Sequence, residues 1–206
     1  MKKNLILFLI IPLFSFAKFY KGNINFIDGS QRSCFIELPE YSDDTKLKFK
    51  SEEKGKAEKI EIDLIKSFEI TNNRNEITKY VTILLANPKP FTNVKFNLDD
   101  KRSWAKIIKE GKITLYSTQE AYNHGSGTGG GTSYYIQKGN EKYAYFIADG
   151  ESGGLSVNMN GFSVFKSCVK SIFENECPKL YELLKKDDFK KKGVTMIIDL
   201  YEQNCN

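Results

Sequence analysis

Three residues in two glycine-rich segments are of the types that could form a nucleophilic centre. His124 is the only histidine and lies in Asn123–Tyr134 (NHGSGTGGGTSY), while Ser152 lies in GESGG, which matches G-x-S-x-G. With Asp149 they follow the order His, Asp, Ser, and a serine nucleophile needs a histidine base that a carboxylate orients. Only 28 residues separate His124 from Ser152, too few for the strands between these residues in trypsin-like proteases. No histidine follows the serine, as an α/β-hydrolase requires.

The sequence therefore favours glycine-rich turns without catalytic residues, and it keeps His124, Asp149 and Ser152 as the alternative. The first loop also contains G-x-G-x-x-G at Gly125, Gly127 and Gly130. A dinucleotide loop of this kind must lead into a helix, whose N-terminus faces the pyrophosphate. Here Thr132–Ile136 follows and favours a strand. We interpret the loop as a connection between strands, and we expect no cofactor.

The sequence gives little support for a metal site or for a catalytic pair of carboxylates. The chain has no C-x-x-C spacing and a single histidine, so we expect no metal site. A glycosidase would need two carboxylates about 5–10 Å apart, which sequence does not reveal. The adjacent pairs Asp43-Asp44, Asp99-Asp100 and Asp187-Asp188 are typical of helix caps and solvated turns.

The N-terminal residues predict export. Lys2 and Lys3 precede the apolar run Leu5–Phe16, and Ser15-Phe16-Ala17 places small residues at the two positions that a signal peptidase reads. We interpret residues 1–17 as a signal peptide cleaved after Ala17, because the apolar run is shorter than the roughly 20 residues of a membrane span. No later segment is apolar enough to cross a membrane. We expect the protein in the periplasm, at the cell surface or secreted.

The charge of the chain argues against nucleic-acid binding. Loss of residues 1–17 removes two lysines and no acid, so the formal net charge falls from +5 to +3. The lysine runs at 185–186 and 190–192 flank two aspartates and are typical of a solvated helix face. The sequence lacks the clustered basic stripe that nucleic-acid binding needs.

The hydrophobic pattern predicts one α+β domain over residues 18–206. Residues 18–148 are rich in β-type alternation and predict an antiparallel body, either a twisted sheet or a partly open barrel. Residues 149–161 form a glycine-rich link. Residues 162–206 change to the helical period, which predicts about three helices.

The four cysteines all lie in the exported part, where disulfides are plausible. A short link between the last two predicted helices favours an antiparallel hairpin, which places Cys177 beside Cys205. Cys34 and Cys168 then remain. They either tie the sheet to the first helix or stay as two free thiols.

Several segments resemble a known group of proteins. These are Gly111–Tyr116 (GKITLY), Tyr134–Glu141 (YYIQKGNE), and a tail from Cys177-Pro178 to Ile198–Cys205 (IDLYEQNC). In this order they are similar to uncharacterised exported proteins of Gram-negative bacteria that have a G-K-x-x-L-Y strand segment and a helical C-P…Y-x-x-x-C tail. The resemblance implies export and the strand-then-helix architecture. It implies no activity, because these motifs are framework residues.

The aromatic content gives the remaining clue to function. The chain has eleven tyrosines, and Tyr134, Tyr135, Tyr143 and Tyr145 border the glycine-rich segments. The sequence favours packing of these tyrosines within the sheet. The alternative is a tyrosine-bearing surface for a glycan or a protein partner, because tyrosine offers a large contact area with a polar tip. The sequence therefore predicts a non-enzymatic binding or envelope-associated module, whose partner is a protein or glycan of the cell envelope. The alternative is a secreted hydrolase that uses Ser152 or a carboxylate pair.

Overall fold

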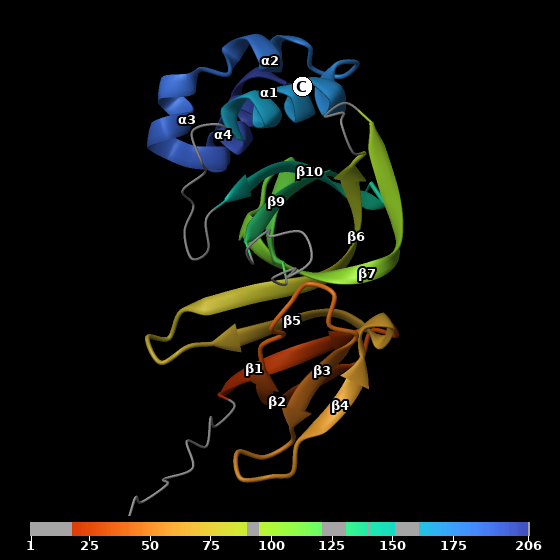
Figure 1. Cartoon of the computed structure of the whole chain (residues 1–206). Coiled ribbons are helices and arrows are strands. Elements are labelled where there is room, and N and C mark those ends of the chain that lie inside the picture. Colours follow the sequence, from red (N-terminus) through yellow and green to blue (C-terminus); the bar gives the residue numbers. More distant parts are fainter. Residues whose placement is uncertain (1–17, 90–94, 121–130, 140, 151–160, 206) are drawn as a thin grey trace, which may run out of the picture.

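The protein is built in three layers. The computed structural model describes residues 18–89, 95–120, 131–139, 141–150 and 161–205. An N-terminal sheet forms the lower layer in Figure 1, a closed barrel the middle layer, and the C-terminal helices the upper layer. The predicted α+β class and order of elements are confirmed, since the strands come first and the helices follow.

Ten strands form one continuous sheet, in the order β10-β9-β8-β7-β6-β5-β1-β2-β3-β4. Their bounds are β1 (Phe19–Phe26), β2 (Gln31–Glu37), β3 (Lys46–Lys50), β4 (Glu58–Glu61), β5 (Ile65–Thr71), β6 (Ile77–Pro88), β7 (Phe96–Lys109), β8 (Ile113–Gln119), β9 (Thr132–Lys138) and β10 (Tyr143–Gly150). A 3-10 turn, η1 (Ile62–Leu64), precedes β5.

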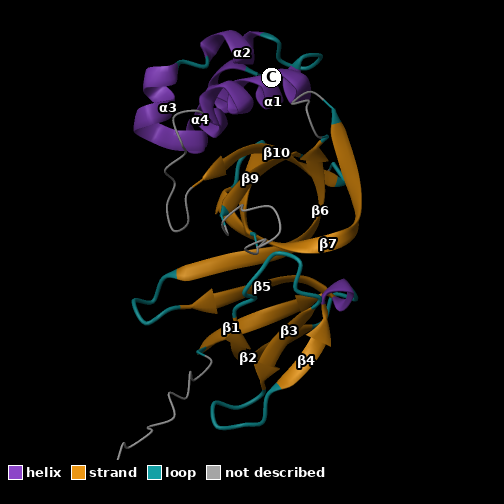
Figure 2. Ribbon diagram, in the orientation of Figure 1, coloured by secondary structure: helices purple, strands orange, loops and turns teal. Residues whose placement is uncertain are grey.

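The barrel consists of β6 to β10, and Figure 2 shows its closure. Each of these strands pairs antiparallel with the next along the chain. The first and last strands of a five-strand meander point the same way, so the pair that closes the barrel must be parallel. This pair joins Tyr143–Tyr145 of β10 to Leu84–Ala86 of β6. Register shifts within three of the antiparallel pairs help the long strands to bend. The sequence predicted antiparallel strands and missed this one parallel pair.

Strand β6 belongs to two layers at once. Along one edge, Ile77–Val81 pair with β5 of the N-terminal sheet, and Leu84–Ala86 pair with β10 of the barrel. Successive side chains of a strand point to opposite faces. Thus Trp104 of β7 packs into the core of the N-terminal sheet, while its neighbour Ala105 packs into the core of the barrel.

The N-terminal core forms around Phe68. Its ring stacks on Tyr80 at 4.8 Å between centroids and meets Trp104 edge-on at 5.4 Å. Strand β1 lies between β5 and β2, and Gly22 is buried where it pairs with both neighbours. A Cβ atom at Gly22 would lie 2.1 Å from the carbonyl oxygen of Glu69. Only glycine therefore fits at this position of β1.

A loop from the N-terminal sheet completes the barrel wall. Strands β7 and β8 pair as far as Lys106 and Ser117. Beyond these residues Ser42 lies between the strands: its N–H donates to the carbonyl oxygen of Gln119, and its own carbonyl oxygen accepts from the N–H of Trp104, both at 2.8 Å. One residue thus supplies the bonds that a continuous β7–β8 pair would have made.

The helices cover the barrel and form the largest core with it. They are α1 (Gly161–Phe173), α2 (Lys179–Leu183), α3 (Lys186–Lys192) and α4 (Met196–Asn204), with a 3-10 turn η2 (Gly193–Thr195) before α4. Helix α1 packs along β10, and buried aliphatic and aromatic residues of β8, β9, α1 and α4 fill the space between. Asp187 and Asp188 were expected at a helix cap or in a solvated turn. They lie in the first turn of α3, close to its N-cap residue Lys185, where the helix dipole favours acids. No helix in the described ranges combines the length and apolarity of a membrane span.

The predicted bond between Cys177 and Cys205 is present, with the two Cα atoms 5.7 Å apart. It joins the start of α2 to the end of α4. The possible bridge between Cys34 and Cys168 is absent, because both are free cysteines buried in different cores. Cys34 packs in the N-terminal sheet and Cys168 against the barrel, so the second alternative, two free thiols that pack as small hydrophobic residues, holds.

Candidate functional site

The structure places one of the three residues of the possible nucleophilic centre. Asp149 lies near the end of β10, is exposed, and accepts a hydrogen bond from the hydroxyl of Ser133 at 2.9 Å. His124 and Ser152 lie outside the described residues, as does most of each glycine-rich segment. The described partner of Asp149 is therefore Ser133 of β9, a residue that the sequence analysis did not propose for the site.

Asp149 opens on a cavity of about 420 Å³ at one end of the barrel. Four carboxylates line it, and among the described residues around it no lysine or arginine does so. The acids are Asp43, Asp99, Glu120 and Asp149. Tyr135 and Phe146 form its aromatic floor, with ring centroids 5.8 Å apart.

The polar groups of this cavity are bonded to one another. The Tyr135 hydroxyl donates to Asn87 Oδ1 at 2.8 Å, and Asn87 Nδ2 donates to Asp99 Oδ2 at 2.9 Å. Burial raises the pKa of Asp99, although the hydrogen bond from Asn87 opposes the shift. Burial also raises the pKa of Tyr135 far above its usual value, and Glu120 and Asp149 add to the shift. In the described part of the chain, no three or more acids, cysteines or histidines are placed to hold a metal ion.

The second hollow is a groove of about 470 Å³ on the outer face of the barrel. One row of paired residues crosses four neighbouring strands beneath it. Tyr80 of β6 pairs with Lys106 of β7, Lys106 pairs with Ser117 of β8, and Ser117 pairs with Tyr134 of β9. Strands lie about 4.8 Å apart, so the row is about 14 Å long. Gln119 and Thr132 pair beside it and also line the hollow. We call this hollow the tyrosine groove.

One wall of the tyrosine groove is the loop that completes the barrel. Tyr41 and Ser42 of this loop line the groove, and the half-buried ring of Tyr41 stands at its edge. The loop is held firmly: Asp44 Oδ2 accepts the backbone N–H groups of Glu40 and Tyr41 at 2.8 and 3.1 Å. The indole N–H of Trp104 donates to the carbonyl oxygen of Asp44 at 2.7 Å. The wall is therefore preorganised.

The lining of the groove is almost neutral. Of the described residues that line it, only Glu40 and Lys106 are charged, and their charges are opposite. Hydroxyl and amide side chains of β8 and β9 line it together with four aromatic residues of the described chain, Tyr41, Tyr80, Trp104 and Tyr134. The floor is closely packed, since Trp104 is 3% and Tyr134 2% exposed, whereas Tyr41 and Tyr80 are half-buried. Such a surface can bind a ligand through aromatic contact and hydrogen bonds.

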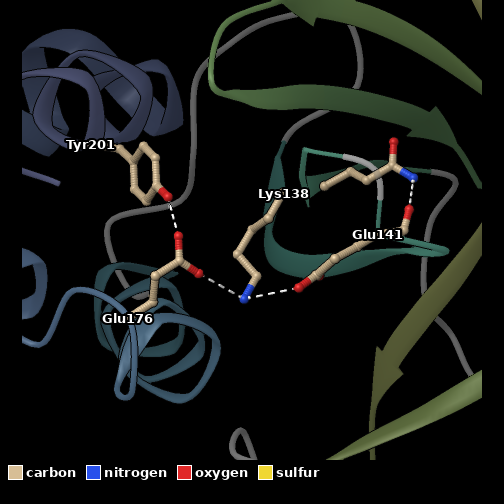
Figure 3. A network of polar contacts seen from close by, with 5 residues as sticks. Lys138, Glu141, Glu176 and Tyr201 are labelled. Carbon is tan, nitrogen blue, oxygen red and sulfur yellow. Dashed lines mark hydrogen bonds and ion pairs between the residues drawn. The ribbon is translucent and has the colours of Figure 1, made fainter. Parts of the chain in front are cut away.

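A third polar cluster joins the barrel to the helices (Figure 3). The ammonium of Lys138 lies 3.1 Å from a carboxylate oxygen of Glu141 and 3.1 Å from one of Glu176. The hydroxyl of Tyr201 donates to the other oxygen of Glu176. Glu176 precedes the disulfide cysteine Cys177, so the ion pairs and the disulfide hold the same segment.

The charges of this cluster stabilise one another. The hydrogen bond from Tyr201 lowers the pKa of Glu176, and Lys138 lowers it further against the effect of burial. Burial, followed by the contact with Glu176, raises the pKa of Tyr201 to about 12. Burial alone would lower the pKa of Lys138, but its bonds to Glu141 and Glu176 raise it. The cluster thus has a structural role between two layers.

The sequence analysis named Tyr134 as a candidate binding residue, but it did not predict the tyrosine groove. Packing within the sheet was the favoured interpretation for Tyr134, and a tyrosine-bearing surface was the alternative. Tyr134 is 2% exposed and belongs to the core between barrel and helices, so the packing interpretation holds, and the residue forms part of the groove floor. Tyr143 and Tyr145 lie on β10 outside the groove, and Tyr135 points into the barrel. Tyr41 and Tyr80 gave no signal of their own, because strand pairing and one long-range loop bring them there. The chain matches no protein-family model, no curated protein and no solved structure.

Proposed function

We propose that this protein is an exported, non-enzymatic binding module of the periplasm or cell surface, and that its ligand binds in the tyrosine groove. The observation that carries the proposal is the row of Tyr80, Lys106, Ser117 and Tyr134 across four strands. A rigid barrel holds these side chains from below, and a hydrogen-bonded loop bounds them at the side. Preorganised side chains lose little conformational entropy on binding, which favours affinity.

Export is supported by two features. The N-terminal residues have the pattern of a signal peptide. The bond between Cys177 and Cys205 is of a kind that persists in oxidising compartments. The resemblance of GKITLY and of the cysteine-bearing tail to exported proteins of Gram-negative bacteria points in the same direction.

The test is retention of the purified protein on washed envelope fragments of its own cells. Tyr41→Ala removes the half-buried ring from the groove wall, and we expect retention to fall by at least about tenfold, or about 1.4 kcal/mol. Tyr143→Ala is the matched control, because this half-buried tyrosine lies on β10 outside the groove. Equal retention of wild type and Tyr41→Ala would show that the groove is not the binding site.

A second candidate function is hydrolysis by a carboxylate pair in the barrel cavity. One observation favours it: the pKa of Asp99 is raised by burial, as a general acid requires, and Glu120 and Asp149 line the same cavity. Asp99→Asn should abolish any hydrolysis that the protein performs and leave envelope retention unchanged. The version that uses Ser152 depends on residues outside the described ranges.

A further inference from the structure

We infer that the ligand of the tyrosine groove is a neutral glycan, bound through its hydroxyl groups and the hydrocarbon faces of its sugar rings. The inference rests on the proposed function and adds the chemical class of the ligand. It follows from three properties of the groove: its charge, the lack of a free edge on the described strands beneath it, and the kinds of side chain that line it.

Charge is the first property. The described lining contains one acid, Glu40, and one base, Lys106. An anionic ligand such as a phosphate ester is normally bound by several arginines, lysines or helix N-termini, and a cationic ligand by several carboxylates. The groove has neither arrangement. The four carboxylates of the barrel cavity lie beyond Ser42, which lines both hollows and separates them.

Backbone pairing is the second property. An extended peptide often binds by adding a strand to a free sheet edge. Throughout the described chain, the four strands under the groove each have neighbours on both sides. At the one place where β7 and β8 separate, Ser42 takes up the backbone N–H of Trp104 and the carbonyl oxygen of Gln119. The strands under the groove therefore offer no edge to which a peptide could add as a further strand.

The kind of side chain is the third property. The amide of the exposed Gln119 and the hydroxyl of the half-buried Thr132 lie on the outward face of β8 and β9, with the buried Ser117 beside them. Amide and hydroxyl groups can both donate and accept hydrogen bonds. Sugar hydroxyls have the same dual capacity. The partly exposed rings of Tyr41 and Tyr80 offer flat apolar surface to the C–H faces of a sugar. A groove about 14 Å long accommodates several sugar units in a row.

A proline-rich peptide is the nearest rival, because such peptides dock in aromatic-lined grooves. These grooves typically use an exposed tryptophan, whose indole N–H donates to a peptide carbonyl. Here Trp104 is 3% exposed, and its indole N–H is already bonded to the carbonyl oxygen of Asp44. The groove thus lacks the donor that this mode of binding requires.

The position of Trp104 makes the experiment direct. It is the only tryptophan of the chain and lines the groove, so its fluorescence reports on binding there. We would titrate the purified protein with cello-, chito- and malto-oligosaccharides, with an oligogalacturonide as the charged analogue, and with a proline-rich peptide. We expect saturable binding of at least one neutral oligosaccharide. Its affinity should change by less than about twofold between about 0.05 and 0.5 M salt.

Variants locate the site. Tyr41→Ala and Gln119→Ala should each weaken oligosaccharide binding by about tenfold, and Tyr143→Ala should leave it unchanged. Binding by no neutral oligosaccharide, stronger binding of the charged analogue, or binding of the peptide alone would each overturn the inference. In those cases, envelope retention that still depends on Tyr41 would preserve the proposed function. Loss of that dependence would remove both.

Discussion

The backbone N–H of Trp104 donates to the carbonyl oxygen of Ser42 at 2.8 Å, and this bond fastens a loop of the N-terminal sheet into the barrel wall. The indole N–H of the same residue holds the loop a second time, at Asp44. One tryptophan therefore fixes the loop through its main chain and its side chain. The wall of the tyrosine groove depends on both bonds.

Replacing the indole tests the second bond. Trp104→Phe keeps an aromatic ring but removes the donor to Asp44, and it leaves a small void in a packed core. We expect the free energy of unfolding to fall by about 1–3 kcal/mol, measured by urea denaturation followed by circular dichroism. Tyr143→Phe, which removes a polar atom from a half-buried ring elsewhere, should cost less than about 0.5 kcal/mol. Equal stability of Trp104→Phe and wild type would mean that the loop is held by other contacts.

The close approach of β1 to β5 at Gly22 gives a second prediction. Gly22→Ala would place a Cβ atom 2.1 Å from the carbonyl oxygen of Glu69, so the paired strands must separate. We expect a loss of about 3 kcal/mol or more in the free energy of unfolding. Gly29→Asn is the control, since Gly29 has open space around it and a φ of 87°, in a left-handed region that asparagine tolerates better than most residues. An alanine at position 22 without measurable cost would contradict the close approach.

The disulfide gives a third prediction. The bond closes a loop with a sequence separation of 28, and restriction of the unfolded chain by a loop of that size is worth about 3–4 kcal/mol. The double variant Cys177→Ser, Cys205→Ser should lose about that much in thermal or urea unfolding. Mass mapping of the oxidised protein, unfolded before alkylation, should find Cys34 and Cys168 alkylated and the other two linked. A link that involves Cys34 would contradict the structure.

The cluster at Glu176 gives a prediction on pH. The pKa of its carboxylate is lowered below 4.5 in the folded protein, so the charged form contributes stability above the pKa of the unfolded chain. That contribution is lost as the pH falls below about 4.5 and through the folded pKa. Glu176→Gln should therefore be less stable than wild type at pH 7, and the difference should shrink in acid. A difference that stays constant between pH 7 and pH 3 would exclude a role for the charge.

Local hydrophobic patterns were enough to predict individual strands and helices. Alternation along residues such as Ile113–Tyr116 and the helical spacing of Phe165, Cys168 and Val169 were visible without any partner, and both became elements of the expected kind. The bond between Cys177 and Cys205 was predicted from a short link between the last two helices. The bond is confirmed, but α3 and η2 lie between α2 and α4, so the predicted short link is wrong.

Pairing between distant strands was not encoded locally. The closure of the barrel depends on the pairing of Tyr143–Tyr145 with Leu84–Ala86. The residue pattern of neither segment predicts that the other is its partner. The tyrosine groove also needs three registers at once, each between strands that are consecutive along the chain. A one-residue slip in any of them would turn a strand's side chains to the opposite face. Its wall further needs Ser42, a residue in a loop with no periodicity. Sequence reasoning could therefore indicate a tyrosine-bearing surface without locating it.

Strand β6 belongs to both the N-terminal sheet and the barrel, so the chain cannot be cut into these two layers without damage to one of them. A cut before Ile77 would leave β5 with β1 as its only neighbour and expose the apolar ring of Phe68. A cut after Pro88 would open the barrel at its closing pair. Anyone who wished to transplant the groove onto another scaffold would have to carry both layers along. For the same reason, unfolding that begins in one layer should destabilise the other layer, and partly unfolded forms should be rare.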